Sequence, residues 1–558
     1  MAEQDFNQYA QLSPFELKDR LIAIASSDAQ RLMLNAGRGN PNFLATLPRW
    51  AFLSLGDFSM REAERSYSYL DSGFGGLPEH TGIVQRFDAY ATAHRLTDGV
   101  RFLRSAISYV KDQLGLDQDA FLFEMVSAFL GCNYPTPPRM LPHVEEIVKA
   151  YLAQEMFGTV PRSGDFSVFA TEGGTAAMTY IFQSLRINGL IAPGDRIAIC
   201  TPIFSPYLEI PALAEYGLEI VDIRMDEHAS WQLPQTEIDK LLDPTIKLLC
   251  LVNPSNPPST KLSDAVLDRL AELVAKQRPD LFIVTDDVYG TFADDFVSIF
   301  ARCPHNTLCV YSFSKFFGAT GWRLGAIALH EKNVFDTALA DLPEIEKQRL
   351  DARYASLTTE PRKIAFLDRL VADSRAVALN HTAGLAVPQQ AQMALFALNG
   401  LMDRGHRYKD AAKQLIRKRY RSLYANMGID AVHTPNDVDY YTLIDLEEIG
   451  GALYGPEFKA WFAQSDLGTS FLFRLAEETG VVLLPGNGFE VVSTSARVSL
   501  ANLTDIEYVA IGRLTRRILD EYQQDFLKSR VTLCLPLHSA DPTAAEMASA
   551  SDGSLGDT

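Results

Sequence analysis

One short segment, residues 310–329 (VYSFSKFFGATGWRLGAIAL), places a lysine among serines, glycines and aromatic residues. The lysine is Lys315, and Arg323 follows it eight residues later. A lysine amine can form an imine with a carbonyl compound, and a partly desolvated site favours the neutral amine that this reaction needs. Arg323 and the hydroxyl of Ser312 are groups that hold a phosphate. The segment therefore points to a phosphorylated aldehyde, pyridoxal 5′-phosphate, although a lone lysine is more often just an exposed loop residue.

Four further segments carry polar or aromatic residues directly after an apolar run that predicts a strand. They are TEGGTAAM (171–178), TPIFSPY (201–207), LVNPSNPPS (251–259) and VTDDVYGTF (284–292). The glycines of the first can open a helix whose free N–H groups bind phosphate. Phe204 can stack on a flat ring, Asn256 can bond a phenolic oxygen, and Asp286 can pair with a protonated ring nitrogen. Each signal alone is also explained by a turn, a helix cap or a core ring.

Alternating strands and helices must position these residues. From about residue 145 to 330, short apolar runs such as RIAIC and IKLLCLV alternate with helical stretches such as DAVLDRLAELVAKQ (264–277). Continuous apolar strands between helices predict an α/β domain around a mostly parallel sheet. In such a sheet, residues at the carboxyl ends of the strands meet in the ligand crevice.

Taken together and in this order, the segments resemble the fold-type I pyridoxal-phosphate aminotransferases. The resemblance rests on TEGGTAAM, NPSNPP, DDVY, SFSKFFGATGWRLG, LLPGNGF (483–489) and SARVSLA (495–501), and it spans roughly 165–505. The pattern S-x-S-K-x-x-x-x-x-G-x-R-x-G at 312–325 is the most specific part. The resemblance implies a large, mostly parallel-sheet domain, a smaller α+β domain and, in this longer chain, helical insertions.

The resemblance also implies a role for each matching residue. Lys315 is the catalytic residue, which bonds to pyridoxal 5′-phosphate and moves the proton. Arg497 and Asn256 bind the substrate α-carboxylate. The expected cofactor-binding residues are Gly174, Thr175, Phe204, Asn256, Asp286, Tyr289, Ser312 and Arg323, with Tyr134 reaching the phosphate of a neighbouring subunit.

Three segments resemble one group within this family more closely, the aspartate 4-decarboxylases. They are LNAGRGNPNF (34–43), NYPTPPRMLPHVEEIVKAYL (133–152) and YSFSKFFGATGWRLG (311–325). The resemblance implies decarboxylation of L-aspartate to L-alanine, with aspartate transamination as a second activity. Arg38 is the candidate for the distal carboxylate, although a solvated loop arginine is an open alternative. The chain could also be an ordinary aminotransferase for aspartate or aromatic amino acids, or a non-catalytic regulator.

The excess length predicts additional parts around the family core. We expect an N-terminal arm and helical extension over 1–144, a large cofactor-binding domain over 145–380 with a helical insertion at 331–380, a small domain over 381–530, and a largely disordered tail over 531–558. The family resemblance implies a homodimer. The segments 83–130 and 331–380 are expected to join dimers into a larger homo-oligomer, for which the decarboxylase resemblance implies a dodecamer.

Composition limits the partners. The net charge of −19 argues against nucleic acid and anionic membrane surfaces. The six cysteines contain no C-x-x-C pair, so we expect neither a disulfide framework nor a metal site. The N-terminal segment is polar, and no run of 18 apolar residues occurs, which predicts a cytoplasmic protein without a membrane span.

Overall fold

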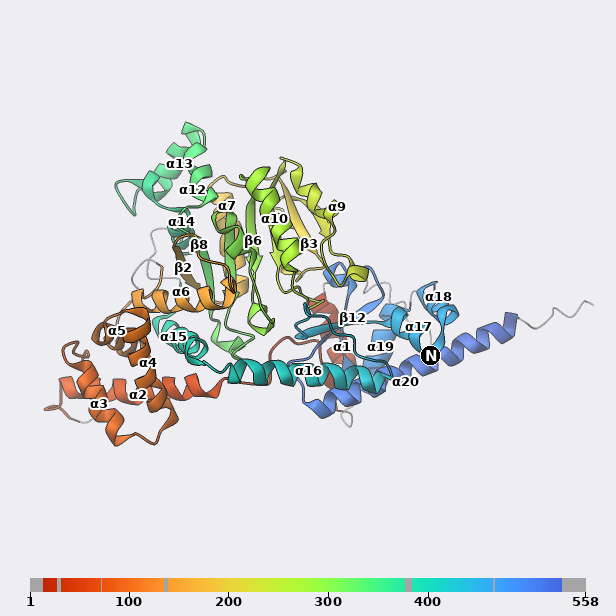
Figure 1. The fold of residues 1–558 in the computed structure, drawn as a ribbon, viewed down its shortest axis with the longest axis horizontal. Helices are drawn as coiled ribbons and strands as arrows, with labels where there is room; N and C mark the ends of the chain where they lie inside the picture. The colour runs from red at the N-terminus through yellow and green to blue at the C-terminus, as the bar shows by residue number, and fades with distance from the viewer. Residues whose placement is uncertain are drawn as a thin grey trace, which may run out of the picture.

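The structure is a computed structural model, and it describes residues 14–27, 32–71, 73–134, 139–376, 384–464 and 467–533. Its centre is a seven-stranded sheet with the strand order β2-β8-β7-β6-β5-β3-β4 (Figure 1). The strands are β2 (Phe166–Thr171), β3 (Arg196–Thr201), β4 (Glu219–Arg224), β5 (Ile246–Val252), β6 (Phe282–Asp286), β7 (Thr307–Ser312) and β8 (Gly325–His330).

Strand β8 is the one strand of this sheet that runs against its neighbours. It pairs antiparallel with β2 and β7, whereas the pairs from β7 to β4 are parallel. The first residue of β8, Gly325, pairs with Ser312 at the end of β7. The start of β8 therefore lies at the same edge as the carboxyl ends of the parallel strands, and this brings Arg323 to that edge.

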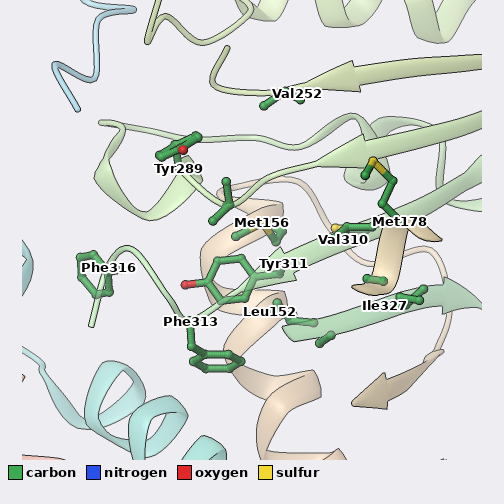
Figure 2. Packing of buried hydrophobic residues seen from close by; sticks show 14 of the residues in the cluster. Leu152, Met156, Met178, Val252, Tyr289, Val310, Tyr311, Phe313, Phe316 and Ile327 are labelled. Atoms are coloured by element: carbon green, nitrogen blue, oxygen red, sulfur yellow. The ribbon is translucent and has the colours of Figure 1, made fainter. Parts of the chain in front are cut away.

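Helices cover the sheet and connect its strands. Those within this part of the chain are α6 (Pro142–Phe157), α7 (Gly174–Ile187), α8 (Pro206–Ala212), α9 (Gln235–Ile238), α10 (Asp264–Lys276) and α11 (Ile299–Arg302). Figure 2 shows side chains of α6, α7 and the strands β5, β7 and β8 gathered in the buried core. The strands β5, β7 and β8 are buried along almost their whole length, as the apolar runs predict for a sheet covered on both faces.

The N-terminal segment forms a helical lobe at one end of the molecule (Figure 1). The lobe consists of α2 (Thr46–Ser66), α3 (Ile83–Ala93), α4 (Asp98–Leu114) and α5 (Gln118–Leu130). The first two elements of the chain, α1 (Pro14–Ala25) and β1 (Leu34–Asn35), lie away from it. Strand β1 pairs with Val481–Val482, which ties the loop after it to the C-terminal part of the chain. Residues 83–130 are helical, as the sequence predicts.

The insertion after β8 is also helical, with α12 (Val334–Asp341), α13 (Glu344–Tyr354) and α14 (Phe366–Ser374). Beyond it, α15 (Val387–Met402) and α16 (Arg407–Met427) lead to a second, antiparallel sheet of order β11-β12-β9. The remaining elements are β9 (Tyr441–Asp445), α17 (Leu446–Tyr454), α18 (Pro456–Gln464), α19 (Gly468–Thr479), β10 (Val481–Val482), β11 (Leu484–Pro485), β12 (Ser495–Ser499) and α20 (Asp505–Leu533).

The tail predicted for 531–558 lies outside the described residues, apart from the end of α20 at Leu533. None of the helices in the described ranges has the length and apolar character needed to span a membrane.

Candidate active site

A cavity of about 320 Å³ lies at the carboxyl edge of the large sheet, where the small sheet approaches it. Every residue that the sequence predicts for the site lines this cavity, with the exception of Tyr134. The predicted residues in its wall are Arg38, Gly174, Thr175, Phe204, Asn256, Asp286, Tyr289, Ser312, Lys315, Arg323 and Arg497. The side chain of Tyr134 is 71% exposed.

Lys315 lies in the turn that follows the end of β7 at Ser312, and it is half-buried. Its Nζ donates a hydrogen bond to the carbonyl of Gly39 at 3.1 Å, in the loop that follows β1. The neighbouring hydroxyls of Ser312 and Ser314 are 2.9 Å apart and buried. Small side chains before the lysine keep the space in front of its amine open.

Another part of the cavity wall consists of groups that suit a phosphate. Helix α7 begins at Gly174. Its N-cap residue is Gly173, which has no side chain to accept a hydrogen bond from the first N–H groups of the helix. The Arg323 guanidinium lies against Gly173, at a place that a Cβ atom would occupy, and Gly173 has a φ of 93°. Glycine at this position therefore permits the close approach of the guanidinium. Free helix N–H groups, the Ser312 hydroxyl and the Arg323 cation together form an anion-binding cradle.

Asp286 ends β6, is buried and lines the cavity. Its carboxylate accepts hydrogen bonds from the Val288 N–H at 3.2 Å and from the Tyr207 hydroxyl at 3.4 Å. Burial raises the pKa of Asp286 to about 6, although both hydrogen bonds and the charge of Lys315 act in the opposite direction. A carboxyl group in this environment is well suited to sharing a proton with a basic ring nitrogen.

Arg497 comes from β12 and reaches the cavity from the small sheet. Its Nη1 donates to Asn256 Oδ1 at 3.0 Å and its Nη2 donates to the Gly37 carbonyl at 2.9 Å. The guanidinium carbon lies 4.4 Å from the centre of the Tyr441 ring and 4.8 Å from that of Phe489. Its Nε is buried and has no hydrogen-bond partner among the described residues. This planar, partly unsatisfied cation is suited to binding a carboxylate through two bonds.

The structure adds residues that the sequence reasoning missed. Tyr441, Lys18, Gly37 and Gly39 also line the cavity. Tyr441 is the first residue of β9 and accepts a hydrogen bond from the Tyr289 hydroxyl at 3.0 Å. No motif marks Lys18 or Tyr441, because both reach the cavity through the packing of distant segments. The glycines beside Arg38 are the one sequence signal for a loop that approaches the site closely.

Comparisons with known proteins agree with this geometry. The family profile "Aminotransferase class I and II" matches residues 131–510, which is most of the chain, so the chain belongs to this family. The predicted fold class is confirmed. An aspartate aminotransferase double mutant from Thermus thermophilus covers 93% of the chain and 100% of its own length, with a TM-score of 0.56 at 17% identity.

More specific similarity comes from one curated relative. The bifunctional aspartate aminotransferase and L-aspartate beta-decarboxylase of a Pseudomonas species is 57% identical over 523 residues, which is 94% of this chain and 98% of the relative. An aromatic aminotransferase from Pyrococcus horikoshii has a TM-score of 0.55 at 16% identity, so it supports only the fold.

Proposed function

We propose that this protein decarboxylates L-aspartate at its distal carboxyl group to give L-alanine and CO₂, and transaminates aspartate as a second activity. The relative of 57% identity, which carries both activities in its name, supports this proposal over nearly the whole chain. The observation that carries it furthest is the cavity itself, which joins Lys315, Asp286 and the anion cradle to two arginines, Arg497 and Arg38.

The cavity fits pyridoxal 5′-phosphate as the cofactor. The glycine position against Arg323 and the uncapped start of α7 suit its phosphate, and buried Asp286 suits its ring nitrogen. Asn256 and Tyr289 are the residues that would contact its phenolic oxygen, and Phe204 its ring. When bound, this cofactor supplies an aldehyde that joins to amines and a ring that withdraws electrons from the attached carbon.

The protein's own residues then have separate tasks. Lys315 carries the cofactor and moves a proton to and from the substrate Cα, while Asp286 keeps the ring nitrogen protonated. Arg497 and Asn256 hold the α-carboxylate. During decarboxylation the bond between Cβ and the distal carboxyl carbon breaks, and a proton from solvent forms a new C–H bond at Cβ. The distal carboxylate must leave as CO₂, so the site must not stabilise it too strongly as an anion. Arg38 meets this condition because it is exposed at the cavity wall.

We also propose that the chain works as a homo-oligomer, with Tyr134 completing the site of a neighbouring copy. The exposure of Tyr134 supports this, because the side chain does not reach its own cavity. A row of exposed apolar residues on α2 supports further association: Leu47, Trp50, Leu53 and Met60 are all at least 40% exposed. This row lies outside the segments 83–130 and 331–380. A dodecamer and a cytoplasmic location stay predictions.

The test is incubation of the purified protein, loaded with pyridoxal 5′-phosphate, with L-aspartate and no amino acceptor. We expect alanine and CO₂ in equal amounts, and the Lys315→Ala variant to produce neither. If aspartate alone yields no CO₂, but is converted to oxaloacetate when a 2-oxo acid is added as amino acceptor, the chain is an ordinary aminotransferase. A wild-type protein that gains no visible absorbance with the cofactor would instead agree with a non-catalytic regulator.

A further inference from the structure

Two tyrosine hydroxyls meet inside the cavity. Tyr289, three residues after the end of β6, donates its proton to the Tyr441 oxygen at 3.0 Å, and both rings are buried. The Tyr441 oxygen also lies so close to Gly39 that a Cβ atom there would clash with it. Arg497 covers the face of the Tyr441 ring. The Tyr441 side chain thus contacts three residues of the site, Tyr289, Gly39 and Arg497.

The charges around this pair explain the direction of the hydrogen bond. Lys315, Arg497 and Tyr440 face the two hydroxyls, and Asp286 and Arg38 line the same cavity. Burial raises the pKa of Tyr441, but the positive charges of Lys315 and Arg497 and the bond from Tyr289 outweigh it and lower the pKa overall. Burial and the neighbouring tyrosines raise the pKa of Tyr289 well above its ordinary value. Tyr441 is therefore the better acceptor, and Tyr289 keeps its proton and donates it.

A tyrosine hydroxyl has one proton to donate. Tyr289 is also the residue that, under the proposed function, bonds the phenolic oxygen of the cofactor. We propose that Tyr441 is a positioning residue that competes for the Tyr289 proton and so limits how strongly Tyr289 donates to the cofactor. This inference rests on the proposed function, and it assigns a task to a residue that no motif marks.

The competition predicts how the pH at which the Lys315–cofactor linkage loses its proton depends on Tyr441. A stronger hydrogen bond from Tyr289 withdraws electron density from the phenolic oxygen and weakens the hold of the Lys315–cofactor linkage on its proton. Removing the Tyr441 hydroxyl frees Tyr289 to donate to the cofactor alone. The linkage then loses its proton at a lower pH. The Tyr441 hydroxyl accordingly keeps the linkage protonated, and reactive toward an incoming amine, up to a higher pH.

The experiment is a pH titration of the visible absorbance of the holoenzyme, with no substrate present. We expect Tyr441→Phe to lower the midpoint by about one pH unit, a tenfold change in proton affinity that corresponds to about 1.4 kcal/mol. Tyr424→Phe is the matched control, because the Tyr424 hydroxyl bonds Thr442 and Leu443 of β9 and not the Tyr289 or Tyr441 hydroxyl. Its midpoint is expected to equal that of the wild type.

A second comparison shows whether Tyr441 acts through Tyr289. In a Tyr289→Phe background, adding Tyr441→Phe is expected to leave the midpoint where Tyr289→Phe alone puts it. A midpoint that is unchanged or raised in Tyr441→Phe, or that falls equally in both backgrounds, overturns the inference. Tyr441→Met, which also lacks the hydroxyl, repeats the test if the phenylalanine variant does not fold. A wild-type protein without a visible band would overturn the cofactor assignment first, so the two failures are distinguishable.

Discussion

Arg497 donates a hydrogen bond to the Asn256 side chain at 3.0 Å, although the two residues are 241 positions apart in the chain. Asn256 belongs to the loop after β5 of the large sheet, and Arg497 belongs to β12 of the small sheet. The bond therefore joins the two sheets across the cavity. It also pre-orients the guanidinium, because the same side chain is held by the Gly37 carbonyl. A carboxylate that binds here meets a cation already in place.

Arg497→Lys is expected to lower kcat/KM for both products by about tenfold to a hundredfold. Lysine keeps the charge but loses the planar fork that binds a carboxylate through two bonds, and such charged hydrogen bonds are worth about 1.5–3 kcal/mol. Steady-state rates of alanine and oxaloacetate formation measure the effect. A change in the ratio of the products would mean that Arg497 does more than hold the shared α-carboxylate.

Arg38→Ala is expected to change the ratio of alanine to oxaloacetate, together with the affinity for aspartate. The structure places Arg38 in the cavity wall, exposed and without a hydrogen bond or ion pair to another described residue. Its guanidinium is therefore available to the distal carboxylate, the group whose fate separates the two reactions. Product analysis by chromatography checks this, with Arg497→Lys as the comparison. An equal fall in both products would show that Arg38 is not a partition element.

Asp287→Asn is expected to stabilise the cofactor-free protein increasingly as the pH rises. Burial and, to a smaller extent, the nearby Asp286 raise the pKa of Asp287 to about 7, against hydrogen bonds from Ser298, Thr285 and Cys309. Because the folded state holds this proton more tightly than the unfolded chain, the stability from the protonated carboxyl is lost between about pH 4 and 7. Asparagine has no ionisable carboxyl group, so the variant does not lose this stability as the pH rises.

The measurement for Asp287 is the melting temperature of variant and wild type between pH 5 and 8. The difference, variant minus wild type, is expected to grow with pH and to exceed the equivalent of about 1.4 kcal/mol, one pKa unit. Asp280→Asn is the matched control, because the Asp280 side chain is 62% exposed and its pKa is lowered by Arg278. A difference that does not vary with pH would mean that Asp287 is ionised throughout.

The double variant Trp50→Glu/Leu53→Glu is expected to dissociate the larger assembly. Both side chains are more than half exposed on the same face of α2, and burying two carboxylates against a second copy is costly. Sedimentation velocity of the holoenzyme checks the assembly size. Ile506→Glu at the start of α20, where the side chain is 81% exposed, is the control. A double variant that sediments like the wild type would show that the α2 face is not a contact between copies.

The sequence is sufficient to predict most of this site for one physical reason. Asp286 ends an apolar strand, Asn256 and Lys315 follow one, and the carboxyl ends of parallel strands meet at one edge. Strand β8 is harder to predict from the sequence. It follows β7 through the turn that contains Arg323, with no α-helix between the two strands, and its antiparallel direction cannot be read from composition. The approach of Tyr441 depends on how a second sheet packs, and no local pattern records that.

The proposed decarboxylation is tested most directly by following each carboxyl carbon of aspartate. L-aspartate labelled with ¹³C at the distal carboxyl is given to the holoenzyme, and the gas and the amino acid are analysed by mass spectrometry. We predict that all label in the turned-over substrate appears as CO₂ and that the alanine is unlabelled. Label retained in alanine, or turnover of aspartate without labelled CO₂, would contradict the account.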